Sequence, residues 1–316
     1  MAYKVFVDGQ EGTTGLKINE RLHDRDDIEL LRIDPEKRKD LRERKELINE
    51  SDITFLCLPD EAAIEAVSLV ENSNTRLIDA STAHRTNDSW AYGFPELSPE
   101  YREKIRKSTR VSVPGCYATG FSALIYPLVR EGIVPHDYPI TCHAVSGYSG
   151  GGKKRISEYA SADPSDESMK SPRFYALTLK HKHLPEMQKI CGLAHPPLFT
   201  PIIGAFYNGM TVAIPLYSAL LPGKNSAKSV CEFLSGYYKG ERFIRVIDYE
   251  SEGGIKDGFL CATGCNGTNT LEIYVRGNDE HILLVARLDN LGKGASGAAV
   301  QCMNIMLGID EATGLE

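Results

Sequence analysis

The sequence has no apolar run of membrane-spanning length, no block of basic residues and no internal repeat. The net charge of −7 argues against a cationic surface for nucleic acid. The N-terminus passes directly into a predicted strand, without the segments of a signal peptide. We therefore expect a cytoplasmic globular protein that has neither nucleic acid nor a membrane as its partner.

Cysteine is sparse, with eight residues spread over a chain of 316. Secreted disulfide scaffolds space their cysteines more densely, so this distribution predicts free thiols in a reducing compartment. Cys261 and Cys265 lie four positions apart, but no second ligand pair accompanies them at the spacing of a zinc site. We expect no bound metal.

The length of 316 residues exceeds the usual size of one domain, and the pattern of the chain changes near residue 140. Before that point short apolar strands alternate with helices, an order that predicts βαβ units and an α/β fold with a parallel sheet covered on both faces. The strands are predicted at residues 3–8, 28–34, 52–58, 75–80 and 110–113. The helices are predicted up to about residue 25, after Pro35, and at residues 60–71 and 98–107.

After residue 140 the chain has longer alternating segments and fewer strand–helix pairs. Strands are predicted at residues 140–146, 210–217, 243–249, 271–276 and 282–288, and helices at residues 117–131 and 227–239. This pattern indicates a second domain of α+β type, built on a mixed or antiparallel sheet. The alanine-rich helix predicted at residues 294–307 is suited to close packing, so we expect it to return to the first sheet or to lie beside a bound cofactor.

A glycine-rich loop at residues 9–15 (GQEGTTG) follows the first predicted strand and opens the first predicted helix. Its spacing is G-x-x-G-x-x-G rather than the common G-x-G-x-x-G of dinucleotide folds. Glycines at such a position let the backbone approach a pyrophosphate at a helix N-terminus. The loop therefore predicts a dinucleotide site, with a tight turn that binds nothing as the alternative.

The residues after the second predicted strand bear on which dinucleotide is bound. Asp34 is placed to accept a hydrogen bond from a ribose hydroxyl, as in NAD sites. Arg32, Lys37 and Arg38 are instead suited to a 2′-phosphate, as in NADP sites. The pattern leaves both cofactors open.

Cys116 follows Pro114 and Gly115, where an apolar β-branched run stops. Apolar residues then recur with helical spacing from Tyr117 onward, so the thiol is predicted at the N-terminus of a helix, on a strand-to-helix turn. Unpaired backbone N–H groups and the helix dipole favour an anion there, and such settings lower the pKa of a thiol. Cys116 is thus a candidate nucleophile, with a small buried apolar cysteine as the alternative.

Two clusters in the second domain carry groups suited to catalysis or binding. Residues 146–155 combine a glycine-rich loop with three cations, which suits a phosphate or carboxylate; a mobile surface loop is the alternative. His181 and His183 offer a general acid or base, and Glu186 offers a group that orients it or holds the substrate. The alternative is a pair of exposed histidines at the start of a helix that Pro185 opens. A metal site would need ligands beyond these histidines, which the sequence does not identify.

Together these motifs resemble those of the N-acetyl-gamma-glutamyl-phosphate reductase family of arginine biosynthesis, in its shorter form, over the full length of the chain. The aspartate-semialdehyde dehydrogenases are similar in architecture and chemistry. The cysteine and histidine motifs are the specific part of the resemblance, because the glycine loop alone occurs widely. The segments that carry it are residues 9–15, 79–85 (DASTAHR), 114–119 (PGCYAT), 146–154, 181–186 (HKHLPE) and 289–295 (DNLGKGA).

The resemblance implies a Rossmann-type dinucleotide-binding domain, whose last helix comes from the C-terminus, and an α+β catalytic and dimerisation domain. We place the first domain at residues 1–115 with 290–316 and the second at residues 116–289. NADPH as cofactor and a homodimer or homotetramer are also implied. Residues 34–36 depart from the family pattern near the expected 2′-phosphate position. By position, the cofactor-binding residues are Gly9, Gly12, Thr13, Thr14, Gly15, Arg38, Ser81 and Asn290.

The implied reaction is the reduction of an acyl phosphate to a semialdehyde, which makes the protein an oxidoreductase. Cys116 attacks the acyl carbon and expels phosphate, and hydride from NADPH then reduces the thioester. His181 is the implied acid/base partner, and a positively charged His181 would help to hold the thiolate.

The residues expected to bind the substrate come from two sources. His183 and Glu186 are carried over by position, and Lys153, Arg155 and Arg85 are candidates for the phosphate or the carboxylate. Aspartyl phosphate and an aminoadipyl phosphate are alternative substrates for the same cysteine and cofactor. A dinucleotide-binding redox sensor is the non-enzymatic alternative, although it gives the histidine cluster no task.

Overall fold

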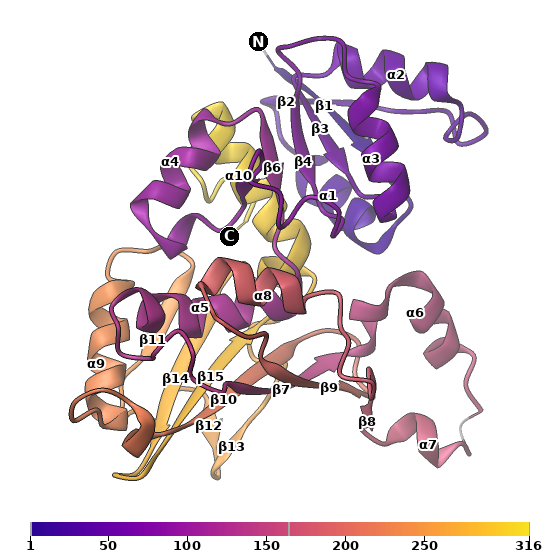
Figure 1. Ribbon diagram of the computed structural model, residues 1–316. Coiled ribbons are helices and arrows are strands. Elements are labelled where there is room, and N and C mark those ends of the chain that lie inside the picture. The colour runs from indigo at the N-terminus through magenta and orange to yellow at the C-terminus, as the bar shows by residue number, and fades with distance from the viewer. Residues whose placement is uncertain (1, 164, 316) are drawn as a thin grey trace. The chain divides into compact units, whose positions relative to one another are not determined.

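The computed structural model describes residues 2–163 and 165–315 (Figure 1). The described chain forms two compact units, one of residues 1–115 with 295–316 and one of residues 116–294. Met1 and Glu316, the outer bounds of the predicted first domain, lie outside the described residues, as does Pro164 in the predicted second domain.

The first unit is built on a parallel sheet, as the alternating pattern predicts. Within the described residues the sheet has six strands in the order β2-β1-β3-β4-β6-β5, and every neighbouring pair is parallel. The strands are β1 (Tyr3–Asp8), β2 (Ile28–Leu31), β3 (Ile53–Leu56), β4 (Arg76–Asp79), β5 (Ala91–Tyr92) and β6 (Arg110–Ser112). The predicted α/β fold class is confirmed for this unit.

Helices cover both faces of this sheet. The helices are α1 (Thr13–Leu22), α2 (Leu41–Glu50), α3 (Asp60–Ser68), α4 (Pro99–Lys107) and α10 (Gly297–Leu307). Figure 1 shows α2 and α3 on one face of the sheet. Ile48 of α2, Ala63 of α3 and Phe6 of β1 belong to one buried hydrophobic cluster there. On the other face α10 packs against α1, α4 and β4, so the last helix returns to the first sheet as expected.

Two predicted helix starts differ from the structure, each for a local reason. The helix expected after Pro35 begins at Leu41, because the Asp40 carboxylate caps it by accepting hydrogen bonds from the Arg42 and Glu43 N–H groups. The helix expected from residue 294 becomes a regular α-helix only at Gly297, after a π-helical turn at Gly292–Ser296.

The second unit is built on a mixed sheet, as its pattern predicts. Among the described residues the sheet has seven strands in the order β11-β14-β15-β10-β7-β9-β8. Only the pairs β7–β9 and β11–β14 are parallel in this part of the chain. The strands are β7 (Thr141–Gly147), β8 (Arg173–Phe174), β9 (Leu198–Gly204), β10 (Met210–Tyr217), β11 (Ile244–Ile247), β14 (Leu271–Gly277) and β15 (His281–Leu288), and a separate hairpin pairs β12 (Ile255–Lys256) with β13 (Phe259–Leu260).

Helices cover one face of the second sheet. The long helix α5 (Cys116–Arg130) lies against β10 and β15, and α9 (Ala227–Tyr237) lies against β11 and β14. Gly120 allows α5 to approach closely, because a Cβ there would lie 2.7 Å from Val212 Cγ2 of β10. Two more helices, α6 (Gly152–Ala160) and α8 (Leu184–Cys191), follow the segments predicted to carry chemistry.

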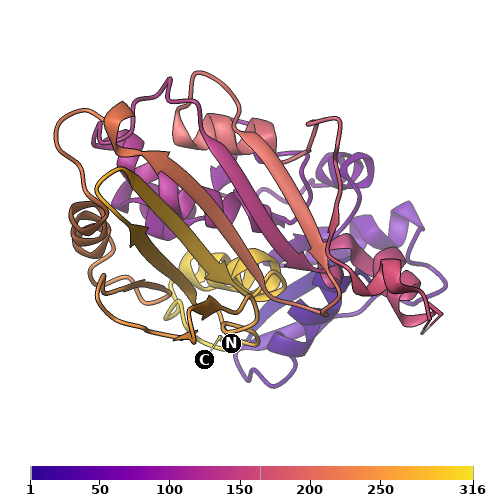
Figure 2. The ribbon, with the colours of Figure 1, turned by 90° about the horizontal axis from the view of Figure 1, so that it is seen from below.

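The opposite face of this sheet is not covered by any described helix, as Figure 2 shows. Side chains along β10 alternate between the helix-covered core and this open face: Val212, Ile214 and Leu216 are buried, whereas Pro215 and Tyr217 are exposed. The second unit therefore presents a broad strand surface. None of the described helices is both long enough and apolar enough to cross a membrane.

Candidate active site

The glycine loop is held in its conformation by close backbone packing at its two ends. Gly9 has φ of +87°, and a Cβ there would lie 2.3 Å from the Cys57 carbonyl oxygen. A Cβ on Gly15 would lie 2.5 Å from the Gly9 carbonyl oxygen. Gly12 is less restricted, with φ of −66° and its nearest neighbour 3.3 Å from a Cβ. Glycine is therefore required at the two ends of the loop, Gly9 and Gly15, but not at Gly12 in its middle.

The loop presents an open helix N-terminus. Gly12 is the N-cap of α1 and supplies no side-chain cap to the N–H groups of the first turn. The Thr13 hydroxyl oxygen is buried and has no hydrogen-bond partner among the described residues. An uncapped helix start, its positive dipole end and an unsatisfied hydroxyl together fit the phosphate oxygens of a dinucleotide.

A pocket of about 670 Å³ adjoins the glycine loop in the first unit. It lies between the loop, α1 and the residues that follow β2, where dinucleotide folds bind the adenosine half of the cofactor. Its lining residues include Gln10, Glu11, Leu16, Asn19, Arg32 and Pro35. The pocket and the loop therefore form a continuous candidate site for a dinucleotide.

A buried ion pair fixes the strand that carries the loop. The Asp8 carboxylate at the end of β1 lies 2.9 Å from Arg44 Nη2, and Arg44 Nη1 lies 2.8 Å from a carboxylate oxygen of Glu65. Burial raises the pKa of Asp8, although hydrogen bonds from Arg44 act in the opposite direction. The pair thus ties β1 to α2 and α3 immediately before Gly9.

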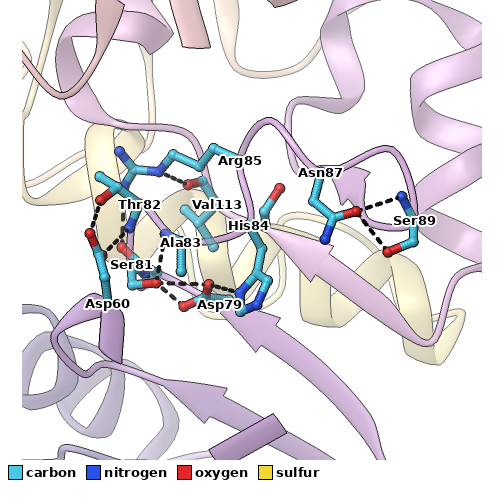
Figure 3. A network of polar contacts seen from close by, with 12 residues as sticks. Asp60, Asp79, Ser81, Thr82, Ala83, His84, Arg85, Asn87, Ser89 and Val113 are labelled. Carbon is cyan, nitrogen blue, oxygen red and sulfur yellow. Dashed lines mark hydrogen bonds and ion pairs between the residues drawn. The ribbon is translucent and has the colours of Figure 1, made fainter. Parts of the chain in front are cut away.

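The DASTAHR segment forms a buried polar network around Asp79 (Figure 3). Asp79 accepts hydrogen bonds from the Ser81 N–H and hydroxyl, both at 2.8 Å, and lies 2.6 Å from His84 Nδ1. The His84 ring stacks on Trp90 with 4.1 Å between ring centres. Ser81 is therefore engaged in holding Asp79, and its expected contact with the cofactor stays a prediction.

Arg85 holds the segment that leads to the cysteine. Its side chain is buried, its Nε donates to the Val113 carbonyl at 2.8 Å, and its Nη2 donates to the Ala80 carbonyl at 3.2 Å. Val113 is three residues before Cys116 in the chain. Arg85 thus orders the Pro-Gly turn before the thiol, and its expected role in binding an anion stays a prediction.

Cys116 is the first residue of α5, so its predicted position at a helix N-terminus is confirmed. Its side chain is partly buried. Gly294, in the segment before α10, packs against it so closely that a Cβ there would lie 2.8 Å from Cys116 Cβ. The thiol is consequently held in place by a glycine from the far end of the unit.

Aromatic side chains that sequence reasoning did not single out surround the histidines. Tyr117 follows Cys116, and its hydroxyl accepts a hydrogen bond from the Tyr175 hydroxyl at 2.9 Å. Phe199 on β9 packs against both Tyr117 and His181, each with 5.1 Å between ring centres. Burial raises the pKa of Tyr175 to about 12, and burial raises that of Tyr117 well above its usual value. Both phenols are therefore neutral near neutral pH.

The environment of His181 determines its charge and its tautomer. Its Nδ1 accepts a hydrogen bond from the His183 N–H at 3.1 Å. Burial lowers the pKa of His181 to about 4, and the charge of Lys182 acts in the same direction. The ring is therefore neutral near neutral pH and carries its proton on Nε2. The expectation of a positively charged His181 that holds the thiolate is wrong for the unliganded protein.

His183 and Glu186 are buried, with exposed fractions of 5% and 1%. The His183 ring lies 4.7 Å from the His181 ring between centres, at an interplanar angle of 87°. His183 precedes α8, which Pro185 opens as predicted, and Glu186 lies in its first turn, where the helix dipole favours a carboxylate. Burial excludes the alternative of a merely exposed His183.

The cations of residues 146–155 lie on a helix rather than on a mobile loop. Lys153 and Arg155 belong to α6, which begins at Gly152. Arg155 forms an ion pair with Glu158, and its charge reaches Tyr175, whose pKa it lowers. Lys153 is exposed and forms no ion pair with the part of the chain that the structure describes. The charge of Arg155 thus acts on Tyr175 of the tyrosine and histidine cluster, whereas no interaction among the described residues links Lys153 to it.

Asp289 and Asn290 of the DNLGKGA segment form buried hydrogen bonds within the second unit. The Asn290 amide is 2% exposed; its Nδ2 donates to the Ser149 hydroxyl at 3.0 Å and its Oδ1 accepts from the Gly209 N–H at 2.7 Å. Asp289, which sequence reasoning missed, accepts from the Asn208 side chain and from the Gly267 N–H. Both residues join loops of the second unit, and the expected contact of Asn290 with the cofactor stays a prediction.

Comparison with known proteins identifies both units. Residues 4–107 match the semialdehyde dehydrogenase NAD-binding domain, and residues 116–290 match the semialdehyde dehydrogenase dimerisation domain. The chain is 52% identical to N-acetyl-gamma-glutamyl-phosphate reductase 2 of Nostoc sp., over 99% of each chain. It is 47% identical to N-acetyl-gamma-glutamyl-phosphate reductase 2 of Pseudomonas putida, over 98% of each chain.

Solved structures share the fold at low sequence identity. An aspartate semialdehyde dehydrogenase of Francisella tularensis superposes with a TM-score of 0.71 at 17% identity, over 97% of this chain and 100% of that one. Aspartate semialdehyde dehydrogenase of Candida albicans, solved with NADP, gives a TM-score of 0.66 at 17% identity, over 97% of this chain and 99% of that one.

A Rossmann-type sheet with an open helix start, joined to a mixed-sheet unit that begins with a cysteine, is the plan of the semialdehyde dehydrogenases. The chain belongs to this family, and its identity of 52% to a full-length relative places it among the N-acetyl-gamma-glutamyl-phosphate reductases. The resemblance drawn from the motifs is confirmed.

Proposed function

We propose that the protein reduces N-acetyl-gamma-glutamyl phosphate to N-acetylglutamate semialdehyde, with release of phosphate, as a step of arginine biosynthesis. The observation that carries the proposal is Cys116 at the start of α5, in a unit that also holds a neutral, half-buried His181. A thiol at a helix N-terminus is activated as an anion, and a neutral imidazole is equipped to donate a proton.

In the first step the Cys116 thiolate attacks the acyl carbon, and the bond from that carbon to the phosphate oxygen breaks. Phosphate leaves and a thioester remains on Cys116. When bound, NADPH supplies the hydride that reduces the thioester carbon. The thiohemiacetal then collapses: its hydroxyl returns the proton to His181, the carbonyl re-forms, and the carbon–sulfur bond breaks with its electron pair on Cys116, which is again a thiolate.

His181 acts on the oxygen of the reacting carbon. Its Nδ1 is occupied by the His183 N–H, so its Nε2 carries the available proton. An oxyanion develops at the tetrahedral stages, and a donor placed for it is more effective than a donor in water. We therefore assign His181 the role of proton donor to that oxygen rather than base for the thiol.

Charged side chains of the second unit hold the substrate in this proposal. Arg155 is the preferred partner for the phosphate or the α-carboxylate, because its charge already reaches Tyr175. Lys153 is a second candidate on the same helix, and Arg85 of the first unit is a third. His183 and Glu186 orient His181 and the amide end of the substrate.

The first unit binds the cofactor NADPH in this proposal. The first-turn N–H groups of α1 and the Thr13 hydroxyl hold the pyrophosphate, and Gly9 and Gly15 let the backbone approach it. Arg38 neighbours the pocket through its ion pair with Glu11. Thr14, Ser81 and Asn290 remain candidates for further contacts.

A homodimer formed through the open sheet face of the second unit completes the proposal. That face exposes apolar side chains on neighbouring strands, among them Tyr217 at 59% and Leu283 at 40%. Burial of such a surface stabilises an association between copies. Substitution of Leu283 by Arg should convert the dimer to a monomer in analytical ultracentrifugation, while a dimer that survives would place the interface elsewhere.

The activity is tested by running the reaction in reverse. The protein is mixed with N-acetylglutamate semialdehyde, phosphate and NADP⁺, and the formation of NADPH is followed by its absorbance. Aspartate semialdehyde and aminoadipate semialdehyde serve as competing substrates, and Cys116→Ser serves as the inactive control. Faster turnover of either competitor would replace the proposed substrate, and dinucleotide binding without turnover of any of them would favour the redox sensor. We propose the cytoplasm as the site of action, because all eight cysteines, each within the described residues, are free thiols.

A further inference from the structure

The glycine loop contains an acidic residue, Glu11, that forms an ion pair with a basic residue in the segment after β2. Glu11 forms an ion pair with Arg38, in which a carboxylate oxygen meets Arg38 Nη1. The two side chains are about half exposed, at 47% and 50%. Glu11 also lines the pocket beside the glycine loop, so this ion pair lies at the wall of the candidate adenosine site.

The three bases that follow β2 differ in their partners. Arg38 is paired with Glu11, and Lys37 Nζ lies 2.6 Å from a carboxylate oxygen of Glu43. Arg32 lines the pocket and forms no ion pair within the described ranges 2–163 and 165–315. Arg32 thus offers the pocket an uncommitted guanidinium, whereas Arg38 does not line the pocket and meets its wall through the ion pair with Glu11.

NADP and NAD differ at this position by a charge. The 2′-phosphate of NADP carries about −1.5 to −2 near neutral pH, by analogy with other phosphate monoesters, whereas NAD carries a neutral hydroxyl there. In dinucleotide folds an arginine after the second strand accommodates the 2′-phosphate. A carboxylate on the same wall repels the phosphate and competes with it for the arginine, but leaves the hydroxyl unaffected.

We propose that Glu11 is a specificity-determining residue that lowers the affinity of the protein for NADP relative to NAD, by repelling the 2′-phosphate and by holding Arg38. Arg32 supplies the uncommitted charge that binds the phosphate, and Arg38 adds to it only after its ion pair with Glu11 opens. The inference rests on the proposed function, because it assumes that a dinucleotide occupies this pocket.

The test measures the dissociation constants of NADP⁺ and NAD⁺ by calorimetry on the full-length protein. Glu11→Gln should raise the affinity for NADP⁺ by about three- to tenfold and leave the affinity for NAD⁺ unchanged. The gain should shrink at high salt, because the groups are half exposed and salt screens them. Arg32→Gln should lower the affinity for NADP⁺ by about tenfold or more and leave NAD⁺ unaffected.

A matched control separates the ion pair from the general charge of the surface. Glu50→Gln removes a carboxylate of similar exposure (44%) from the Lys4–Glu50 pair of the same unit, and neither residue lines the pocket. It should leave the affinities for both dinucleotides unchanged. Arg38→Gln should cost more NADP⁺ affinity in the Glu11→Gln background than in the wild type, because Arg38 is free to bind phosphate only in that background.

The outcomes distinguish this inference from the proposed function. If wild-type protein binds neither dinucleotide, the cofactor assignment fails and the inference fails with it. If both dinucleotides bind but Glu11→Gln leaves the NADP⁺ affinity unchanged or lowers it, only the inference is overturned. An equal gain from Glu50→Gln would also overturn it, because the effect would then belong to the overall charge of the surface. Thermal unfolding of each variant checks that the fold is retained.

Discussion

Two histidines of this protein occupy opposite environments, one in each unit. His84 of the first unit donates a hydrogen bond from its Nδ1–H to the buried Asp79 carboxylate, 2.6 Å away, and its ring stacks on Trp90. His181 of the second unit receives a hydrogen bond at its Nδ1 from the His183 N–H. In their neutral forms the two rings therefore carry their protons on opposite nitrogens.

This difference suits His84 to a structural role and His181 to a role in proton transfer. The buried His84 ring stacks on Trp90 and its Nδ1 is engaged by Asp79, which suits it to hold the loop before Arg85. His181 is half-buried, neutral and able to donate from Nε2. The partner of Nδ1, rather than the presence of an imidazole, decides which role a histidine takes here.

The largest effect is expected from substitution of the candidate nucleophile, Cys116. Cys116→Ser should lower turnover by at least about four orders of magnitude, because a hydroxyl does not supply an anion near neutral pH. Steady-state kinetics measures the loss, and titration with NADPH should give an affinity close to that of the wild type. Turnover near the wild-type rate would remove covalent catalysis by Cys116.

The next effect sharpens the role of His181. His181→Asn should lower kcat by on the order of a hundredfold, because the developing oxyanion loses its proton donor. The free energy of unfolding near pH 7 should change little, since the side chain is only partly buried. A kcat unaffected by this change would assign the donor to another group. His183→Asn is the companion variant: it should raise KM more than it lowers kcat, and a larger loss of kcat than in His181→Asn would exchange the two roles.

The corresponding change at His84 should affect stability rather than chemistry. His84→Ala should lower the free energy of unfolding by about 2 kcal/mol, because the buried Asp79 carboxylate loses a hydrogen-bond partner. Urea unfolding measures this loss, and kcat per folded molecule should fall far less than in His181→Asn. His84→Asn should recover part of the stability by restoring a donor. Full stability of the alanine variant would contradict the structural role.

The smallest effect is a pH dependence that comes from His181. Its pKa is lowered from 6.5 to about 4 in the folded protein, so the unfolded chain binds more protons between these values. The contribution is complete above about pH 6.5 and is lost as the pH falls toward about 4, where both states are protonated. After discounting for the partial exposure of the ring, we expect about 1 kcal/mol. Urea unfolding at about pH 7 and about pH 4.5 should show a smaller difference for His181→Asn than for the wild type; an equal difference would assign it to other groups.

The regular elements were predictable where the local pattern and the tertiary contacts agree. β1 and β10 occupy the predicted residues, because apolar runs bounded by turn residues leave few alternatives. β9 was missed because Pro201 interrupts it, and proline argues against an inner strand. Next to β9 lies only the two-residue strand β8, which pairs with Ile202 and Ile203, and the Pro201 carbonyl accepts a hydrogen bond from the Tyr175 N–H at 3.2 Å, so this side of the strand needs no N–H from Pro201.

The sequence motifs predict which residues belong to the candidate site, but not how buried each residue is, which partners it has or what charge it carries. The motifs locate Cys116, His181 and Glu186, because spacing places them at helix starts. The charge of His181 depends instead on burial and on a neighbouring N–H group, which follow from the folded chain. Tyr175 was missed for the same reason, since it reaches Tyr117 across 58 positions. Similarly, the sequence shows Glu11 and Arg38 as separate charges, and only the fold pairs them.

The return of α10 to the first sheet has a consequence for protein synthesis. The strands of that sheet are complete once Ser112 has been made, but the helix that covers one of its faces begins only at Gly297. At usual translation rates, α10 is synthesised on the order of tens of seconds after the last strand of the sheet. Residues 116–294 form a continuous unit, so all of its residues have been made before α10 begins. Hydrogen bonds such as that of Arg25 with Asn304 then close the first unit, so the sheet that leaves the ribosome first is the last to be buried.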